Sequence, residues 1–384
     1  MNTFLVKPKV IFGNQSLDYL CDLQVKKAFI VTDQMMVKLG TADKIISRLS
    51  GAEYKVFSEV EPNPSLETVK AGFSSFLEEK PDLLIALGGG SPIDTAKAIL
   101  SFFDKAAQKF DGKMEFARPT FVAIPTTSGT GSEVTSYSVI TDTARHIKIP
   151  MSDDCMYPDV AILDEQLTKT VPPSVTADTG MDVLTHALEA YVSPNAVEFT
   201  DIYAERAIKI IFTYLLRAYR FGEDLDARGK LHVASCMAGV AFTNASLGIN
   251  HSLAHAVGAK FHLSHGKSNA ILLPYVIQFN GGLCDGTVDT SKAAKRYTEI
   301  AKMLGFASST LEEGVLSLAT AVKYLNKRMG IPSTLKECNI DEQLFEENVP
   351  VIAEEACHDI CTTGNPKSVS KEDFKNLLKW AYEG

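Results

Sequence analysis

The feature that most constrains the fold is an alternation of strand and helix patterns in the first part of this 384-residue chain. Helical periodicity at 66–80 and 92–106 lies between runs of apolar and β-branched residues. Those runs predict strands at 26–33, 52–60, 81–91 and the start of 120–132. The pattern predicts an α/β domain with a mostly parallel, Rossmann-like sheet, in which ligands bind at the carboxyl ends of the strands.

The second part of the chain has a different pattern. Helical periodicity with little β-branched alternation covers 174–193, 200–221, 226–246 and 291–305. Two prolines in "TVPPS" (170–174) separate the two patterns. We therefore expect two domains, an α/β domain over residues 1–171 and an all-α helical domain over residues 172–384.

Composition and charge exclude several classes of protein. Hydrophobic residues make up 45% of the chain and no long apolar run is free of charge, which indicates a soluble globular protein without a membrane span. The N-terminal residues lack the apolar core of a secretory signal. A net charge of −9 without a basic stripe argues against nucleic acid or an anionic membrane as partner. The seven scattered cysteines include no CxxC pair, so we expect reduced thiols and a cytoplasmic location.

A glycine turn follows the third predicted strand, in "LLIALGGGSPIDTAK" (83–97). Gly88, Gly89 and Gly90 let the backbone approach a ligand closely, and the helix that follows presents free N–H groups suited to a pyrophosphate. Asp94 complements the dipole of that helix. The stretch is not the GxGxxG fingerprint, so an ordinary strand-to-helix turn is the alternative.

A second turn, "PTTSGTGSEVT" (125–135), directly follows the next strand. Its side chains can wrap a cofactor with hydroxyl groups, beside the backbone amides of two glycines. The hydroxyl-bearing residues are Thr126, Thr127, Ser128, Thr130 and Ser132. The alternative is a loop that caps a helix, with Glu133 in its first turn. Two such turns in one α/β domain favour a dinucleotide-binding site.

Asp33 ends the first predicted strand. A carboxylate at this place can accept hydrogen bonds from both ribose hydroxyls of an adenosine and repels a 2′-phosphate, which favours NAD over NADP. The alternative is a strand-terminating Asx turn, in which the side chain bonds only to its own backbone.

Four of the eight histidines lie in "LGINHSLAHAVGAKFHLSHGKSN" (247–269), a stretch that otherwise reads as buried helix. The four are His251, His255, His262 and His265. Buried polar groups need partners, so these rings either form a satisfied core network or hold an ion. Their number and the one-turn spacing of the first two favour the ion.

Asp182 and His186 lie four residues apart on another predicted helix, so their side chains share one face with Val183, Ala187 and Ala190. An inward carboxylate is costly unless it is paired or binds a cation. A structural Asp–His hydrogen bond is the alternative for this pair alone. With two imidazoles of the 247–269 stretch, the pair makes one carboxylate and three nitrogens, which suits Fe²⁺ or Zn²⁺. Spacing does not choose which two of the four histidines bind.

Together these motifs resemble the iron-containing (group III) alcohol dehydrogenases. The resemblance rests on "GGGSPIDTAK", "PTTSGTGSEVT", "GMDVLTHALEAYVS" and "INHSLAHAVGAKFHLSHGKSNAILLP", and it runs from "VIFGNQSL" (10–17) to "CTTGNPK" (361–367). Within the family, "MDVLTHALEAYVSPNAVEFTDIYAERA" is most similar to the 1-propanol dehydrogenase branch of propanediol-utilising bacteria. Lys367 stands where relatives often have Arg.

The resemblance implies roles for particular residues. It implies that a divalent metal, Fe²⁺ or alternatively Zn²⁺ or another ion, is bound by Asp182, His186, His251 and His265. It implies that His255 supports the metal ligands or faces the cofactor near the nicotinamide, as a candidate proton relay. His262 matches no ligand position of the family, so we expect it to be a satisfied or exposed histidine. The NAD(H) site would comprise Asp33, Gly88, Gly89, Gly90, Ser91, Asp94, Thr126, Thr127, Thr130 and Lys148. Phe242 and Cys361 would line the substrate pocket.

The implied activity is hydride transfer between NAD(H) and a small primary alcohol or aldehyde, such as propanal, with the metal acting on the substrate oxygen. A glycerol dehydrogenase-like enzyme or a dehydroquinate synthase-like lyase is the alternative on the same fold, and a non-enzymatic scaffold is a third. The lyase needs several basic residues to grip a phosphate-bearing sugar acid, and this stretch offers mainly Lys260 and Lys267. By resemblance we also expect a homodimer or larger homo-oligomer, with encapsulation in a bacterial microcompartment as a further option.

Overall fold

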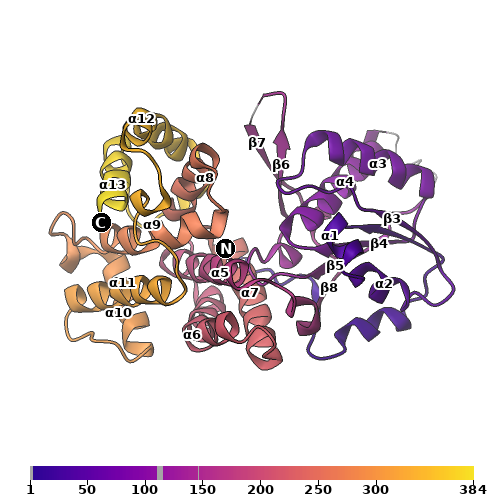
Figure 1. Ribbon diagram of the computed structural model, residues 1–384, viewed down its shortest axis with the longest axis horizontal. Coiled ribbons are helices and arrows are strands. Elements are labelled where there is room, and N and C mark those ends of the chain that lie inside the picture. Colours follow the sequence, from indigo (N-terminus) through magenta and orange to yellow (C-terminus); the bar gives the residue numbers. More distant parts are fainter. Residues whose placement is uncertain (1–2, 110–115, 146) are drawn as a thin grey trace. The chain divides into compact units, whose positions relative to one another are not determined.

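A computed structural model of the chain describes residues 3–109, 116–145 and 147–384 (Figure 1). The chain divides into two compact units. Leu5–Val171 form an α/β unit, and Pro172–Gly384 form a helical unit that Phe4 joins by stacking on Phe199 at a ring-centroid distance of 5.2 Å. Each unit is described by itself. Within the described residues, every helix is too short or too polar to span a bilayer.

The α/β unit contains a six-stranded sheet in which every neighbouring pair of strands is parallel. In spatial order the strands are β1 (Lys9–Phe12), β8 (Val160–Leu163), β5 (Thr120–Pro125), β4 (Leu83–Gly88), β2 (Lys27–Val31) and β3 (Glu53–Phe57). The helices are α1 (Gln34–Lys38), α2 (Thr41–Ile46), α3 (Leu66–Glu79) and α4 (Gly90–Lys109). Short 3₁₀ helices occur at η1 (Ser16–Asp22), η2 (Ser132–Val134), η3 (Asp154–Met156) and η4 (Glu165–Thr168).

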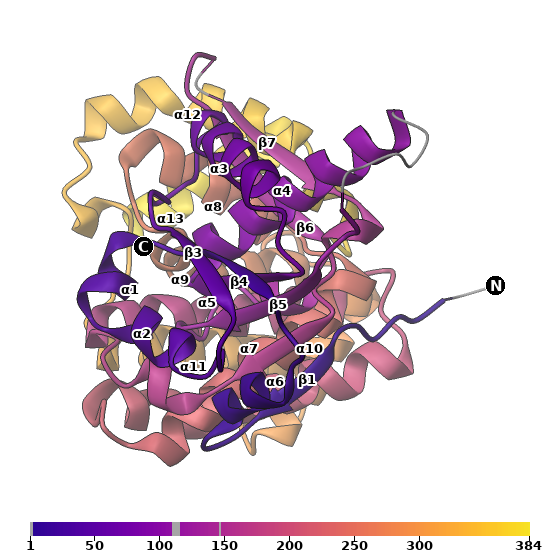
Figure 2. The ribbon, with the colours of Figure 1, turned by 90° about the vertical axis from the view of Figure 1, so that its right-hand side faces the viewer.

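Helices cover both faces of this sheet, which explains the continuous apolar runs of its central strands. Along β2, Phe29 and Val31 pack with α3 and α4, whereas Ala28 and Ile30 pack with η1 and α2 on the other face. Figure 2 shows α3 and α4 on one side of the strands and α1 and α2 on the other. The doubly wound arrangement confirms the predicted fold class, and it brings the turns after β2, β4 and β5 to one edge of the sheet.

An antiparallel hairpin of β6 (Tyr137–Asp142) and β7 (Ile147–Ser152) interrupts the βα alternation. The sequence pattern does not predict this hairpin, nor β1 and β8. Strand β6 packs on α4, where the Ser138 hydroxyl donates to the carbonyl of Asp94 (2.9 Å). The hairpin therefore lies beside the helix that follows the glycine turn.

Nine helices of the described residues form the helical unit. They are α5 (Pro173–Val192), α6 (Glu198–Arg220), α7 (Leu225–Ala245), α8 (Ile249–Phe261), α9 (His265–Asn280), α10 (Lys292–Met303), α11 (Leu311–Arg328), α12 (Glu342–His358) and α13 (Lys371–Glu383). Three 3₁₀ turns join them, η5 (Val288–Thr290), η6 (Lys336–Cys338) and η7 (Ile360–Gly364). Helix α5 is buried from Met181 to Val192 and packs against α6, α7 and α9. The polar side chains in this part of α5 are therefore surrounded by protein, and each of them needs a partner there.

Candidate metal centre and cofactor turns

Four side chains from three helices converge in the helical unit. Asp182 and His186 lie one turn apart on α5, His251 lies on α8, and His265 is the first residue of α9. One ligand atom of each lies within 4.8 Å of a ligand atom of every other. The structure therefore brings together the four residues that the family resemblance implies, and it leaves His262 exposed at the end of α8.

The geometry of this cluster suits a divalent ion. Asp182 Oδ1 lies 3.4 Å from His265 Nε2 and 3.7 Å from His251 Nε2, and the His186 ring stacks on the His251 ring at 4.5 Å. Asp182 is only 4% exposed. One carboxylate and three imidazoles form a donor set that Fe²⁺ and Zn²⁺ both accept, without the thiolates that would select softer ions. The residues present therefore fit the metal of the resemblance.

Electrostatics within the ion-free cluster follow from this crowding. Burial works to raise the pKa of Asp182, but the imidazoles of His186, His265 and His251 outweigh it and hold this pKa well below its usual range. Burial lowers the pKa of His265 to about 3, against the attraction of Asp182. The Asp182 carboxylate is thus charged and the His265 ring neutral near neutral pH, which are the forms that bind a metal. Burial works to lower the pKa of His251, but Glu189 and Asp182 raise it to about 9, so an ion must displace a proton from this ring.

The cofactor turns lie together in the α/β unit. Gly88 has a φ of +146°, and a Cβ on it would lie 2.6 Å from Pro92 Cγ, so this position requires glycine. A Cβ on Gly90 would meet Thr130 Cγ2 at 3.1 Å, and one on Gly89 would meet Thr127 Oγ1 at 3.4 Å. The first glycine turn therefore packs directly against the second, Thr-rich turn, as a shared dinucleotide site requires.

Asp33 lies beside the same turns. Its Oδ1 accepts from the backbone N–H groups of Met35 (2.8 Å) and Met36 (3.0 Å), so it caps α1 as in the Asx-turn alternative. Its Oδ2 lies 3.4 Å from the place that a Cβ on Gly88 would take. Asp33 Oδ1 thus caps α1, while Oδ2 faces the glycine turn.

Comparison with known proteins decides the family. The model of the iron-containing alcohol dehydrogenases matches residues 7–165, and that of the C-terminal part of the Fe-containing alcohol dehydrogenase family matches residues 176–382. The chain belongs to the iron-containing alcohol dehydrogenase family. It is therefore an oxidoreductase of alcohols and aldehydes, and its family implies a divalent metal and a nicotinamide cofactor.

Relatives cover the whole chain. It is 45% identical to the NADPH-dependent butanol dehydrogenase of Clostridium saccharobutylicum, over 100% of this chain and 99% of that protein. It is 40% identical to the 1-propanol dehydrogenase PduQ of Salmonella typhimurium, over 99% of each. Among solved structures, a 1,3-propanediol oxidoreductase superposes with a TM-score of 0.89 at 32% identity and 100% coverage of both chains. The predicted family, fold class and oxidoreductase activity are confirmed.

The dehydrogenase's predicted relay residue, His255, belongs to a second group beside the metal ligands. Its Nδ1 lies 2.7 Å from Asp359 Oδ2, and its ring stacks on the His265 ring at 5.2 Å. Asp359 Oδ1 accepts from the backbone N–H of Cys361 (2.8 Å). Burial works to raise the pKa of Asp359, but its bond to His255 lowers it to about 2. His255 is therefore oriented by a carboxylate that the sequence analysis did not identify.

The two predicted pocket residues lie next to these groups. The Phe242 ring stacks on the His186 ring at 4.6 Å. Cys361 follows Asp359 in η7, and burial raises the pKa of its thiol well above the usual value. A neutral thiol of this kind offers an apolar surface rather than a nucleophile.

Two predicted cofactor residues, Asp94 and Lys148, make hydrogen bonds within the protein. Both oxygens of Asp94 are used within the protein, since Oδ1 accepts from the Ser132 hydroxyl (2.8 Å) and Oδ2 from the N–H of Val139 (3.0 Å). Asp94 thus holds the second turn and β6 in place. Thr126 is buried, and Lys148 Nζ on β7 donates to Asn63 Oδ1 (3.3 Å). Ser91 lies in the first turn of α4.

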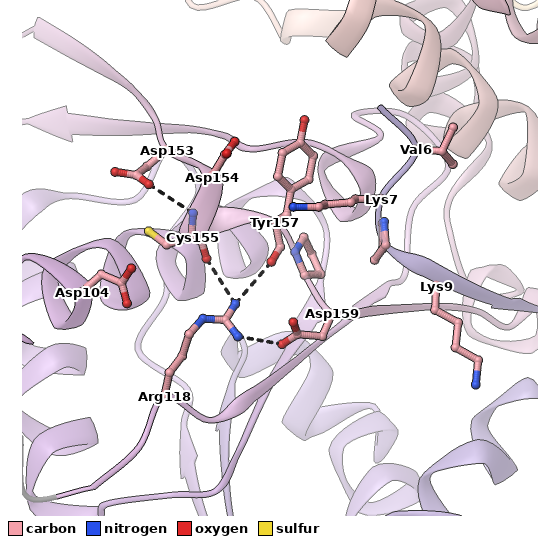
Figure 3. Close-up of a pocket in the computed structure, with 12 residues that line it drawn as sticks. Val6, Lys7, Lys9, Asp104, Arg118, Asp153, Asp154, Cys155, Tyr157 and Asp159 are labelled. Carbon is pink, nitrogen blue, oxygen red and sulfur yellow. Dashed lines mark hydrogen bonds and ion pairs between the residues drawn. The ribbon is translucent and has the colours of Figure 1, made fainter. Parts of the chain in front are cut away.

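Figure 3 shows a groove of about 790 Å³ elsewhere in the α/β unit, reached by Val6 from the start of the chain. Arg118 crosses it, paired with Asp159 at 2.9 Å and donating to the carbonyls of Cys155 and Tyr157. None of the predicted site residues, all of which lie in the described part of the chain, lines this groove. Arg118 and Asp159 neutralise each other there, and we assign the groove no ligand.

Proposed function

We propose that this enzyme reduces short-chain aldehydes such as propanal to primary alcohols with NADH, at a divalent metal, in the first place Fe²⁺, bound by Asp182, His186, His251 and His265. The observation that carries the proposal is the convergence of these four ligand groups in the interior of the helical unit. A carboxylate and three imidazoles are costly to bury together in a protein interior, and a bound ion would compensate for that cost.

The chain's own residues supply the rest of the proposed chemistry. A bound divalent ion would polarise the oxygen of the aldehyde. The Phe242 ring against His186 gives the substrate an apolar wall, which suits a short aliphatic chain. His255 has its Nδ1 engaged by Asp359, which leaves Nε2 as the nitrogen that can hold or pass the alcohol proton.

For the cofactor we propose NADH rather than NADPH. The support is Asp33, whose Oδ2 carboxylate oxygen faces the glycine turn and would repel a 2′-phosphate. The butanol dehydrogenase of Clostridium saccharobutylicum, which is 45% identical to this chain, depends on NADPH, so the preference for NADH is the first point to test. The cofactor turns belong to the α/β unit and the ligand set to the helical unit, so each can be tested by binding alone.

The experiment is NADH oxidation with propanal by metal-stripped enzyme, before and after anaerobic addition of Fe²⁺ or Zn²⁺. We expect activity only after addition, and the rates with Fe²⁺ and Zn²⁺ show which ion supports turnover better. The His265→Ala variant, treated identically, is the control for adventitious metal. Failure of every ion to restore turnover in protein that still binds NADH would contradict the proposal.

We further propose that the enzyme forms a homodimer or a larger homo-oligomer. Strand β1 is an edge strand of the six-stranded sheet, and its Phe12 side chain is 67% exposed. Unpaired edges with exposed aromatic residues are usually covered in proteins. Light scattering after size-exclusion chromatography tests this proposal, and a monomer at micromolar concentration would contradict it.

A further inference from the structure

The side-chain amide of Asn269 lies among the proposed metal ligands. Its Nδ2 is 2.7 Å from Asp182 Oδ1, 3.2 Å from His265 Nε2 and 3.3 Å from His251 Nε2. Asn269 is one turn after His265 on α9, so the two share a face, and it is completely buried. A single neutral donor thus contacts three of the four ligand groups.

Asn250 fixes the orientation of the Asn269 amide. Asn250 Nδ2 donates to Asn269 Oδ1 (2.9 Å) and to the Asn269 carbonyl (3.2 Å). Asn250 is held by its own backbone N–H, which donates to Glu189 Oε1 (2.7 Å), while Glu189 Oε2 lies 2.5 Å from His251 Nδ1. Because Oδ1 of Asn269 already faces a donor, its NH₂ group must point toward the ligands.

A hydrogen-bond donor at the position of the Asn269 amide can hold two of the ligand groups close to each other. Asn269 Nδ2 lies within hydrogen-bonding distance of both Asp182 Oδ1 and His265 Nε2, which belong to different helices, so this amide can bridge the two ligand groups. An amide group has two hydrogens, which matches these two nearest acceptors. A bound ion would take the lone pairs of the imidazoles, whereas a carboxylate oxygen can also keep a hydrogen bond, so Asn269 can retain Asp182 in either state.

We infer that Asn269 is a positioning residue of the metal centre, which keeps Asp182 and His265 convergent before an ion binds and holds Asp182 afterwards. The inference rests on the proposed metal site. It also explains why an uncharged residue with a full set of hydrogen bonds occupies the centre of a ligand set. Glu189 and Asn250 then support the same centre from behind, through His251 and Asn269 respectively.

The test measures Zn²⁺ binding to the metal-stripped full chain by competition with a chelating dye, without substrate or cofactor. Asn269→Leu removes the donor and keeps the branched shape of the side chain, and Asn269→Ala removes the donor without adding apolar volume, in case the first variant fails to fold. We expect either to weaken Zn²⁺ binding by about 10–100-fold, as loss of a group that orients a metal ligand does elsewhere. Asn326→Leu is the matched control, because Asn326 is equally buried and donates to the carbonyl of Ala270 (2.6 Å) instead.

Asn269→Asp separates positioning from a merely structural role. The new carboxylate would lie beside Asp182, so we expect the metal-free variant to unfold at a lower temperature and yet to bind Zn²⁺ more tightly than Asn269→Leu. A structural role predicts that stability and affinity fall together. Affinities of Asn269→Leu and Asn269→Ala within about twofold of the control would overturn the inference alone, whereas a wild-type chain that binds no Zn²⁺ would overturn the metal site as well.

Discussion

Lys97 provides the sharpest test of how the cofactor turns are held. Its side chain is completely buried in α4, and its Nζ donates to Ser132 Oγ (2.9 Å), Thr135 Oγ1 (2.9 Å) and the Tyr137 carbonyl (2.8 Å). These three acceptors belong to the second turn and the start of β6. Lys97 therefore ties the Thr-rich turn to the helix that begins at the glycine turn, and the change to test is Lys97→Met.

The magnitude follows from the charges that this change leaves behind. Asp94 and Glu133 are the carboxylates that interact with Lys97, and burial raises the pKa of Glu133 to about 7 although Lys97 opposes it. Removing one partner of a buried ion network costs about 3–5 kcal/mol. At roughly 2–4 °C per kcal/mol for a unit of this size, we expect the melting temperature of the α/β unit to fall by about 6–20 °C.

The sign of the pH dependence is also fixed. A folded-state pKa above the unfolded value of 4.5 means that the folded chain binds more protons, so this group makes stability fall as pH rises from 4.5 to about 7. Without Lys97 the pKa of Glu133 rises further, and the folded state must keep its proton to a higher pH. The destabilisation caused by Lys97→Met should therefore be larger at pH 8 than at pH 6, and Glu133→Gln in the same chain should reduce the difference.

Thermal unfolding and NADH binding, followed by fluorescence, measure this prediction. We expect weaker NADH binding but unchanged Zn²⁺ affinity, since the proposed metal ligands belong to the helical unit. Lys105→Met is the matched control, because Lys105 is an exposed lysine of the same helix. If Lys97→Met melts within about 1 °C of this control, where a surface change costs at most about 0.5 kcal/mol, then the network does not hold the turn.

Three further predictions concern the site itself. We expect His255→Ala to lower kcat by about 100-fold or more, while the metal content measured by elemental analysis stays constant. If the variant loses its metal together with its activity, then His255 is a metal ligand or directly supports one. His265→Ala should release the metal, and a variant with full occupancy would refute that ligand. Asp33→Ser should raise kcat/KM for NADPH relative to NADH by at least about tenfold, because a like-charge clash is removed; an unchanged ratio would assign cofactor choice to other residues.

Much of the fold was predictable because buried strands and helices require apolar residues at regular positions in the sequence. Strands β2, β4 and β5 are buried on both faces, so they appear as continuous apolar runs, and α3 begins within a residue of its predicted start. Strands β1 and β8 have only four residues each, too few for a period to be recognised. Strand β7 is largely exposed and contains Pro150, a residue that argues against a strand in a sequence-based prediction.

Spacing alone predicted the candidate site only where one helix carries two ligands, and the choice of His251 and His265 came from the family resemblance. The spacing of Asp182 and His186 predicts a shared face, and Glu189 lies on the same face one turn after His186, a signal that the sequence analysis overlooked. The contact of Asp359 with His255 spans 104 residues, and that of Glu189 with His251 spans 62. Helix packing sets such contacts, and no local period reveals them.

Asp33 shows that two interpretations of one residue need not compete. Its Oδ1 caps α1 through Met35 and Met36, while Oδ2 faces Gly88, so the Asx turn and the proposed cofactor contact use different oxygens of one carboxylate. Capping needs only a side-chain acceptor, which serine also provides, whereas repulsion of a 2′-phosphate needs the charge. Asp33→Ser therefore removes the second role and keeps the first. Asp33→Ala would remove both, and the loss of the cap, about 1 kcal/mol, would obscure any change in cofactor preference.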